Sequence, residues 1–182
     1  MVTQSKKRAP RKSAKSRINQ PRYIIPVVLG PPRVGSTDDF VGRPPVVEVR
    51  VVAYDSAATE SSDRMQVGKP RLAMIDTGAE GTFIDSAAAA EIGAKSTHKA
   101  RVHGMNVTTQ AQGTDIQILF PASNLTFRTK AVFADFRGQG NCFDLIIGRT
   151  FLQHCRLSMN GPRGLFRLEW LGPAKKADPA TQ

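Results

Sequence analysis

Residues 74–84 read Met74-Ile75-Asp76-Thr77-Gly78-Ala79-Glu80-Gly81-Thr82-Phe83-Ile84. The segment is apolar on both sides of an acid, a hydroxyl and a glycine, which predicts a buried strand that breaks into a tight turn at Asp76. A carboxylate there is costly to remove from water unless neighbouring groups hydrogen-bond it. Glycine lets the backbone bend and lets another group approach closely. Two carboxylates held in this way can share one proton and activate a water between them.

A second apolar segment follows about seventy residues downstream. It reads Phe143-Asp144-Leu145-Ile146-Ile147-Gly148-Arg149-Thr150-Phe151-Leu152. Leu145 to Ile147 are apolar at consecutive positions, which predicts a strand buried on both faces. The second segment matters because the tripeptide Asp76 to Gly78 alone is equally typical of an Asx turn at the end of a strand.

Together the two segments resemble the retropepsins, the single-domain aspartic proteases of retroviruses and their cellular relatives. The retropepsin-like domain of DNA-damage-inducible proteins is similar too. The resemblance covers about residues 46–171 and is carried by Ile75 to Glu80, Thr82, and Ile146 to Arg149. It implies a mainly β fold, a closed or partly open barrel of short strands with one or two short helices, that acts as a homodimer.

The resemblance also implies an activity, that of an aspartic endopeptidase cleaving extended peptides with apolar side chains. This chemistry needs two carboxylates in near contact, one of which holds a proton. Because the chain has one Asp-Thr-Gly, a homodimer would place two copies of Asp76 across its symmetry axis. The implied site has catalytic Asp76, active-site loop residues Thr77 and Gly78, and substrate-binding residues Ala79, Glu80, Gly104, Met105 and Asn106.

Gly148 and Arg149 are implied to support this loop structurally. The resemblance leads us to expect an ion pair between Arg149 and Glu80 within one subunit. No metal and no cofactor are expected. His98, His103 and His154 follow no common zinc spacing, and Cys142 and Cys155 do not complete one.

Four segments are expected along the chain. Residues 1–22 should form a disordered basic tail, 23–45 a proline-rich extended linker, 46–171 the domain, and 172–182 a disordered C-terminal tail. Within the domain, residues 85–93 predict a short helix with Asp85 or Ser86 as N-cap and Gly93 at its end. Residues 98–105 and 108–120 predict a hairpin that we interpret as a flap over the cleft. An ordinary surface hairpin is the alternative.

The net charge of +11 is unevenly distributed. Residues 1–22 hold eight basic residues and no acid, so 18 basic and 15 acidic residues leave +3 for the remainder. Such a tail can bind nucleic acid or an anionic surface, or can be a solvated terminus. No apolar run is long enough to span a membrane. Two cysteines, expected to be reduced, suggest a cytoplasmic location, with nuclear or organellar targeting by the tail left open.

Two other functions compete with the protease. One is a catalytically silent dimer of the same fold that binds peptides or partners, since folds outlive their chemistry. The other is a protein that binds nucleic acid through residues 1–22, whose domain serves to dimerise. The intact Asp76, Thr77 and Gly78 favour the enzyme.

Overall fold

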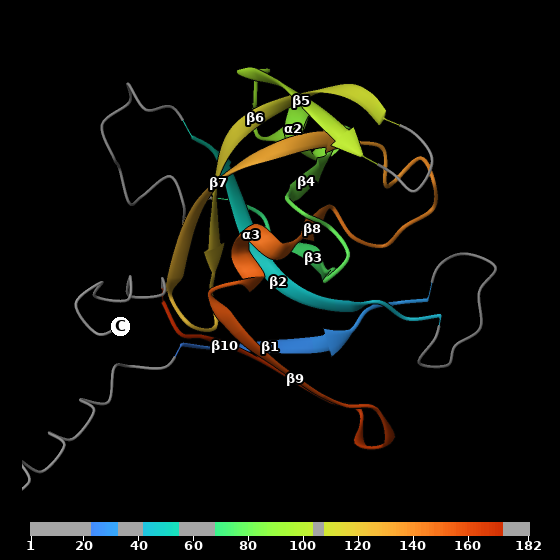
Figure 1. Cartoon of the computed structure of the whole chain (residues 1–182), viewed down its shortest axis with the longest axis vertical. Coiled ribbons are helices and arrows are strands. Elements are labelled where there is room, and N and C mark those ends of the chain that lie inside the picture. The colour runs from blue at the N-terminus through green and yellow to red at the C-terminus, as the bar shows by residue number, and fades with distance from the viewer. Residues whose placement is uncertain (1–22, 33–41, 55–67, 104–107, 173–182) are drawn as a thin grey trace, which may run out of the picture.

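The fold is a closed β-barrel formed by the middle strands of one sheet, and further strands extend that sheet at its two ends (Figure 1). The computed structural model describes residues 23–32, 42–54, 68–103 and 108–172. Within these ranges one sheet has the order β5-β6-β7-β4-β8-β3-β2-β1-β10-β9, and an additional β6–β2 pairing closes the ring from β6 to β2. The barrel strands are β2 (Pro45–Ala53), β3 (Arg71–Ile75), β4 (Thr82–Asp85), β6 (Thr108–Phe120), β7 (Leu125–Ala134) and β8 (Leu145–Ile147). The prediction of a mainly β fold with a closed barrel is therefore confirmed.

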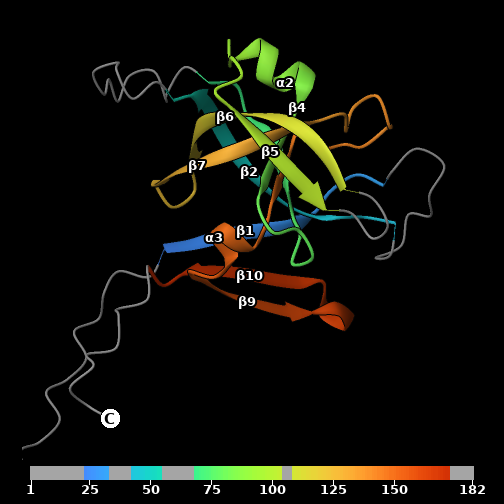
Figure 2. The same cartoon turned by 45° about the horizontal axis from the view of Figure 1, so that its top comes forward.

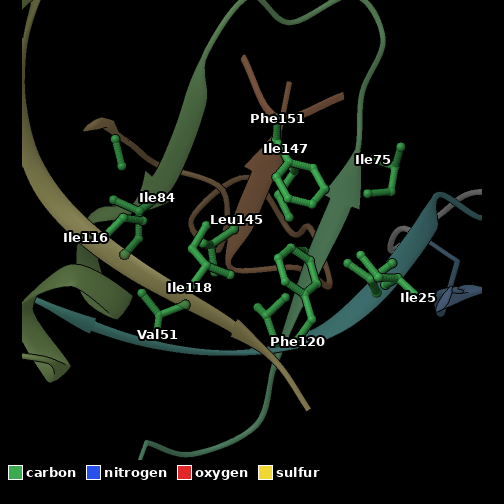
Figure 3. Close-up of a cluster of buried hydrophobic side chains, with 14 of the residues drawn as sticks. Ile25, Val51, Ile75, Ile84, Ile116, Ile118, Phe120, Leu145, Ile147 and Phe151 are labelled. Carbon is green, nitrogen blue, oxygen red and sulfur yellow. The ribbon is translucent and has the colours of Figure 1, made fainter. Parts of the chain in front are cut away.

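Three short strands form the middle of the barrel. β8 runs parallel to β3 and antiparallel to β4, with Ile147 beside both Ile75 and Thr82. Alternate side chains point inward, so that Ile75, Ile84, Leu145 and Ile147 meet in the core shown in Figure 3. The intervening residues face outward. Ile146 is one of these and is only half-buried, so the prediction that this strand is buried on both faces is wrong at that position.

In the described part of the chain, two short helices flank the barrel. α2 (Ser86–Glu91) has Asp85 as its N-cap, and the helix is followed by Gly93 at φ +68°. This helix was predicted from the sequence, and both its cap and its stop are confirmed. α3 (Arg149–Leu152) follows Gly148 and places Phe151 in the core, where its ring stacks on Phe120 at 4.9 Å between centroids. A 3-10 turn, η1 (Gly161–Arg163), links the last two strands.

The remaining strands extend the sheet at its two ends. β5 (His98–His103) pairs with β6 to form the predicted hairpin. On the other side β1 (Tyr23–Leu29), β10 (Leu165–Trp170) and β9 (Cys155–Asn160) form the layer seen at the bottom of Figure 2. Among the described residues, no helix is long and apolar enough to cross a membrane.

The strand β1 corrects one expectation. Residues 23–45 were expected to be a linker, but Tyr23–Leu29 pairs with β10 and with the start of β2. Ile25 and Val27 are buried in the core at 2% and 6% exposure, and that burial outweighs the single proline, Pro26, within the strand. The expected tail at 1–22, most of the expected tail at 172–182, and Gly104, Met105 and Asn106 lie outside the described residues.

Candidate active site

Asp76 lies where β3 ends and the chain turns. Its backbone N–H donates to the Ile147 carbonyl at 3.1 Å, which keeps the residue in line with the sheet. One carboxylate oxygen, Oδ1, accepts from the N–H of Gly78 at 2.8 Å and from that of Ala79 at 3.3 Å. Within the described part of the chain, the second oxygen accepts no hydrogen bond. The turn thus fixes one side of a half-buried carboxylate and leaves the other side open.

The loop after Asp76 is packed against the start of α3. A Cβ on Gly148 would lie 2.6 Å from the Ala79 carbonyl oxygen and closer still to that of Gly81, so only glycine fits. The Arg149 N–H donates to the Ala79 carbonyl at 2.9 Å, and the Thr150 N–H donates to the Glu80 carbonyl at 3.0 Å. These contacts hold the loop that follows Asp76 against the start of α3.

The expectation of an ion pair between Arg149 and Glu80 is wrong. Among the described residues no ion pair joins the two side chains, and both are exposed. Backbone hydrogen bonds at the start of α3 already connect the two segments, so the guanidinium is not needed for that connection. Thr77 is exposed, and so is Gly78.

An apolar surface adjoins Asp76 on the outside of the barrel. Met74, Ile146 and Phe83 lie in one row across three neighbouring strands and are all half-buried. Met74 precedes Asp76 by two residues, and because Asp76 directly follows the end of β3, alternation places both side chains on the outer side. We call Met74, Phe83 and Ile146 the apolar surface.

The β5–β6 hairpin reaches out from the barrel above the loop between β3 and β4 in both Figure 1 and Figure 2. Register places Gly113 beside Val132, and Val132 beside Phe83, so this side of the hairpin continues the outer side of the barrel. Ala100, Val102 and Ala111 lie on that side and are small and apolar. Lys99 and Arg101 lie on the opposite side and are exposed.

A network of charged groups lies at the other end of β3 and β8. Arg71 donates to Asp144 at 2.9 Å and to Glu91 at 3.0 Å, and Arg137 donates to the same two acids at 2.7 Å each. Lys69 approaches Glu91 as well. Hydrogen bonds from Lys69, Arg137 and Arg71 lower the pKa of Glu91 to about 2. Sequence reasoning missed this network, because partners such as Arg71 and Asp144 lie 73 residues apart and form no local pattern.

Asp85 connects this network to α2. Its Oδ1 accepts from the N–H groups of Ala87 and Ala88, and its Oδ2 accepts from those of Phe136 and Arg137 at 2.9 and 3.0 Å. Burial acts to raise the pKa of Asp85, but these backbone donors outweigh it and the pKa lies below its usual value. The carboxylate is 1% exposed and stays ionised because all four donors stabilise its charge.

The three histidines lie apart from the Asp76 turn. His98 contacts the Thr97 hydroxyl, His103 contacts the Thr108 hydroxyl, and His154 packs on Trp170 at 5.3 Å between ring centroids. Within the described ranges no three His, Cys, Asp or Glu side chains form a group that could hold a metal ion. Both cysteines are free thiols in the structure.

In a comparison with protein families, residues 64–151 match the family model of aspartyl proteases. The resemblance predicted from the sequence is thus confirmed over the segment that contains Asp76 and α3. A comparison with curated proteins gave no match.

The solved structures that match this chain include two proteases. EIAV protease in complex with the inhibitor HBY-793 shares 17% identity over 64% of this chain and 92% of its own, with a TM-score of 0.41. A retropepsin-like aspartic protease from Rickettsia conorii shares 14% identity over 82% of this chain and 91% of its own, with a TM-score of 0.43. Because both TM-scores lie below 0.5, the fold assignment rests on the strand topology of this chain.

Proposed function

We propose that this chain, whose residues 64–151 match the aspartyl protease family, is an aspartic endopeptidase acting on extended peptides. One observation carries the proposal. Two backbone N–H groups hold Oδ1 of Asp76, and in the described residues the other oxygen is left without a hydrogen bond. A carboxylate that is fixed on one side and open on the other suits a group that must hold a water and exchange a proton with it.

The reaction requires a second carboxylate, which we assign to Asp76 of a second copy of the chain. Two carboxylates in near contact cannot both ionise, so the pair holds one proton. The ionised carboxylate takes a proton from the water as its oxygen attacks the peptide carbonyl. The protonated carboxylate donates a hydrogen bond to the oxygen on which negative charge develops. Collapse of the tetrahedral intermediate then breaks the C–N bond, and the leaving nitrogen is protonated by the pair.

A homodimer is supported by the chain having one Asp-Thr-Gly and by the position of that loop. Thr77 and Gly78 are exposed directly beside Asp76, so a second copy can approach there without disturbing the core. In this arrangement Thr77 would contact its symmetry mate. Ala79 and Glu80 would line the cleft, together with Gly104, Met105 and Asn106, which lie outside the described residues.

The substrate is proposed to carry apolar side chains next to the cleaved bond. The apolar surface of Met74, Phe83 and Ile146 is half-exposed beside Asp76, and the hairpin presents small apolar residues on the same side. Burying one large apolar side chain there would contribute about 1.5–3 kcal/mol to binding. An extended backbone would be held as an added strand.

The decisive experiment is a peptide-library digest at several pH values with the wild-type chain and the Asp76→Asn variant. We expect cleavage between apolar residues that rises below neutral pH, and a loss on the order of 10⁴-fold in Asp76→Asn. Asp115→Asn is the matched control, because its carboxylate also accepts a hydrogen bond, from the Thr97 hydroxyl, but lies elsewhere. Equal cutting by wild type and Asp76→Asn, or no cutting by a confirmed dimer, would refute the enzyme.

A nucleic-acid tether is the second candidate, favoured by the eight basic residues within 1–22. The tether predicts an affinity for nucleic acid that falls steeply as the salt concentration rises. Binding should disappear when residues 1–22 are deleted. We also propose that residues 1–22 and 172–182 are tails on either side of the domain, and that the protein is cytoplasmic. A silent peptide-binding dimer would bind apolar peptides without cleaving them.

A further inference from the structure

The mechanism gives no role to the charged network, although the network contains a strongly buried arginine. The Arg71 side chain is 2% exposed, and Asp144 beside it is 15% exposed. Burying charges is costly, and replacing such a network with apolar residues is often neutral or stabilising. Its members also lie at the end of β3 and β8 remote from Asp76, so they do not touch the reacting groups.

What the network holds in place is the loop from residue 135 to residue 143. Asp85 ties this loop to α2 through the N–H groups of Phe136 and Arg137, and the Arg137 side chain ties it to Asp144 and Glu91. Gly138 N–H donates to Asp135 within the loop, and near the end of the loop the Cys142 thiol donates to the Pro31 carbonyl at 3.2 Å. The charged contacts therefore anchor the first part of the loop, at Phe136 and Arg137.

The loop in turn supports the apolar surface. Phe136 and Phe143 are buried, with ring centroids 5.3 Å apart, and Met74, Phe83 and Ile146 pack against them. The two rings are buried, so a ligand would touch the three half-buried residues that pack against them. A shift of the loop would change the shape of the surface beside Asp76 without moving Asp76 itself.

From this geometry we propose that Asp85 and Arg137 are positioning residues for substrate binding. They hold Phe136 and Phe143 against the apolar surface, and this fixes a binding site for a large apolar side chain of the peptide. The inference rests on the proposed function, because it assumes that the surface beside Asp76 binds substrate. It adds two residues that determine which side chain binds.

Asp85→Asn separates the two tasks of this carboxylate. The amide keeps one acceptor oxygen, which can still cap α2 through Ala87 and Ala88, and asparagine is as good an N-cap as aspartate. The amide nitrogen would then face the N–H groups of Phe136 and Arg137, so that donors meet donors. The loop loses its attachment while the helix keeps its cap.

The experiment measures binding without cleavage. The probe is a fluorescent peptide whose central peptide bond is replaced by CH₂–NH, made with either phenylalanine or alanine beside that bond. Anisotropy is measured with full-length wild type, Asp85→Asn, Arg137→Lys and the control Asp115→Asn, whose carboxylate accepts from Thr97 outside the network. Wild type and Asp115→Asn should bind the phenylalanine peptide about tenfold or more tightly than the alanine peptide.

In Asp85→Asn this preference should fall below about threefold, with the alanine peptide bound as in wild type, and Arg137→Lys should lie between. With a cleavable phenylalanine peptide, KM should rise and kcat should stay within about twofold. A purely structural role would instead weaken both peptides equally. If Asp85→Asn fails to fold by circular dichroism, Arg137→Met, whose side chain is 35% exposed, takes its place.

Unchanged preference in the folded variants would overturn the inference, and so would equal loss for both peptides or no preference in wild type. The proposed function fails separately, through the absence of Asp76-dependent cleavage. A wild-type chain that prefers the phenylalanine peptide but cuts nothing would leave the positioning role intact and the enzyme refuted.

Discussion

Replacing Gly148 with alanine should move the Asp76 loop while leaving the rest of the barrel in place. The new Cβ would lie 2.6 Å from the Ala79 carbonyl oxygen, whereas contacts below 3.0 Å are essentially never seen and ordinary contact begins at 3.4 Å. The Ala79 carbonyl must therefore retreat by 0.4 to 0.8 Å, and the closer Gly81 carbonyl must retreat further. Both groups are backbone, so no side-chain rotation can relieve the contact.

The retreat has two measurable costs. It lengthens the hydrogen bonds from the Arg149 and Thr150 N–H groups, and together with overpacking this should lower the free energy of unfolding by about 1–3 kcal/mol. A displacement of about 1 Å at a catalytic group costs about 100-fold in rate. We therefore expect kcat/KM for an apolar peptide to fall by about 100-fold, with a dimer that still forms.

Gly81→Ala is the matched control in the same loop, because a Cβ there meets nothing within 4 Å. It should keep kcat/KM within about threefold of wild type. The assays are peptide cleavage under conditions where the wild type is active, and thermal unfolding. Wild-type activity in Gly148→Ala, or an equal loss in both variants, would refute the argument that close packing at this glycine positions Asp76.

Further predictions concern stability and thiol reactivity. Arg71→Met should lower the free energy of unfolding, measured in urea, by about 2 kcal/mol. This loss is smaller than for an isolated buried ion pair, because Arg137 still compensates the charges of Asp144 and Glu91. An unchanged free energy of unfolding would contradict a stabilising network. The lowered pKa of Glu91 contributes stability that is complete above its ordinary value of 4.5 and is lost as the pH falls toward about 2. Glu91→Gln should therefore make the unfolding temperature depend less steeply on pH between those values. An unchanged pH dependence of the unfolding temperature would contradict this contribution. Burial raises the pKa of Cys155 from 9.0 to about 12. At pH 8, iodoacetamide should therefore label Cys155 in the folded protein at about a thousandth of the rate in the unfolded protein, as measured by mass spectrometry. Rapid labelling of the folded protein would contradict this burial.

The barrel and its turn were predictable because their signals are local. The apolar flanks of Asp76 and the run from Leu145 to Ile147 indicate strands directly, and Asp85 followed by Ser86 and four alanines indicates a capped helix. Each pattern is read within about ten residues. Closure of the ring by β6 and β2 follows from a long bent strand and has no comparable local signal.

The errors have a common physical origin, which is pairing between distant segments. Tyr23–Leu29 looks like a linker because of its surrounding prolines, and only the burial of Ile25 against β10 makes it a strand. The segments of Glu80 and Arg149 are joined by backbone hydrogen bonds, from Arg149 to Ala79 and from Thr150 to Glu80, which the sequence does not display. The attachment of the 135–143 loop through Asp85 was missed because a helix cap was reason enough for an acid at that position.

The pairing of β1 with β10 joins residues that are separated by more than 130 positions. Contacts between such distant residues slow folding, because a large loop must close before they form. During synthesis, Ile25 and Val27 therefore leave the ribosome long before Leu168 and Phe166 are available to cover them. A fragment that stops short of residue 165 would leave this strand facing water, and degradation or aggregation would be its natural fate.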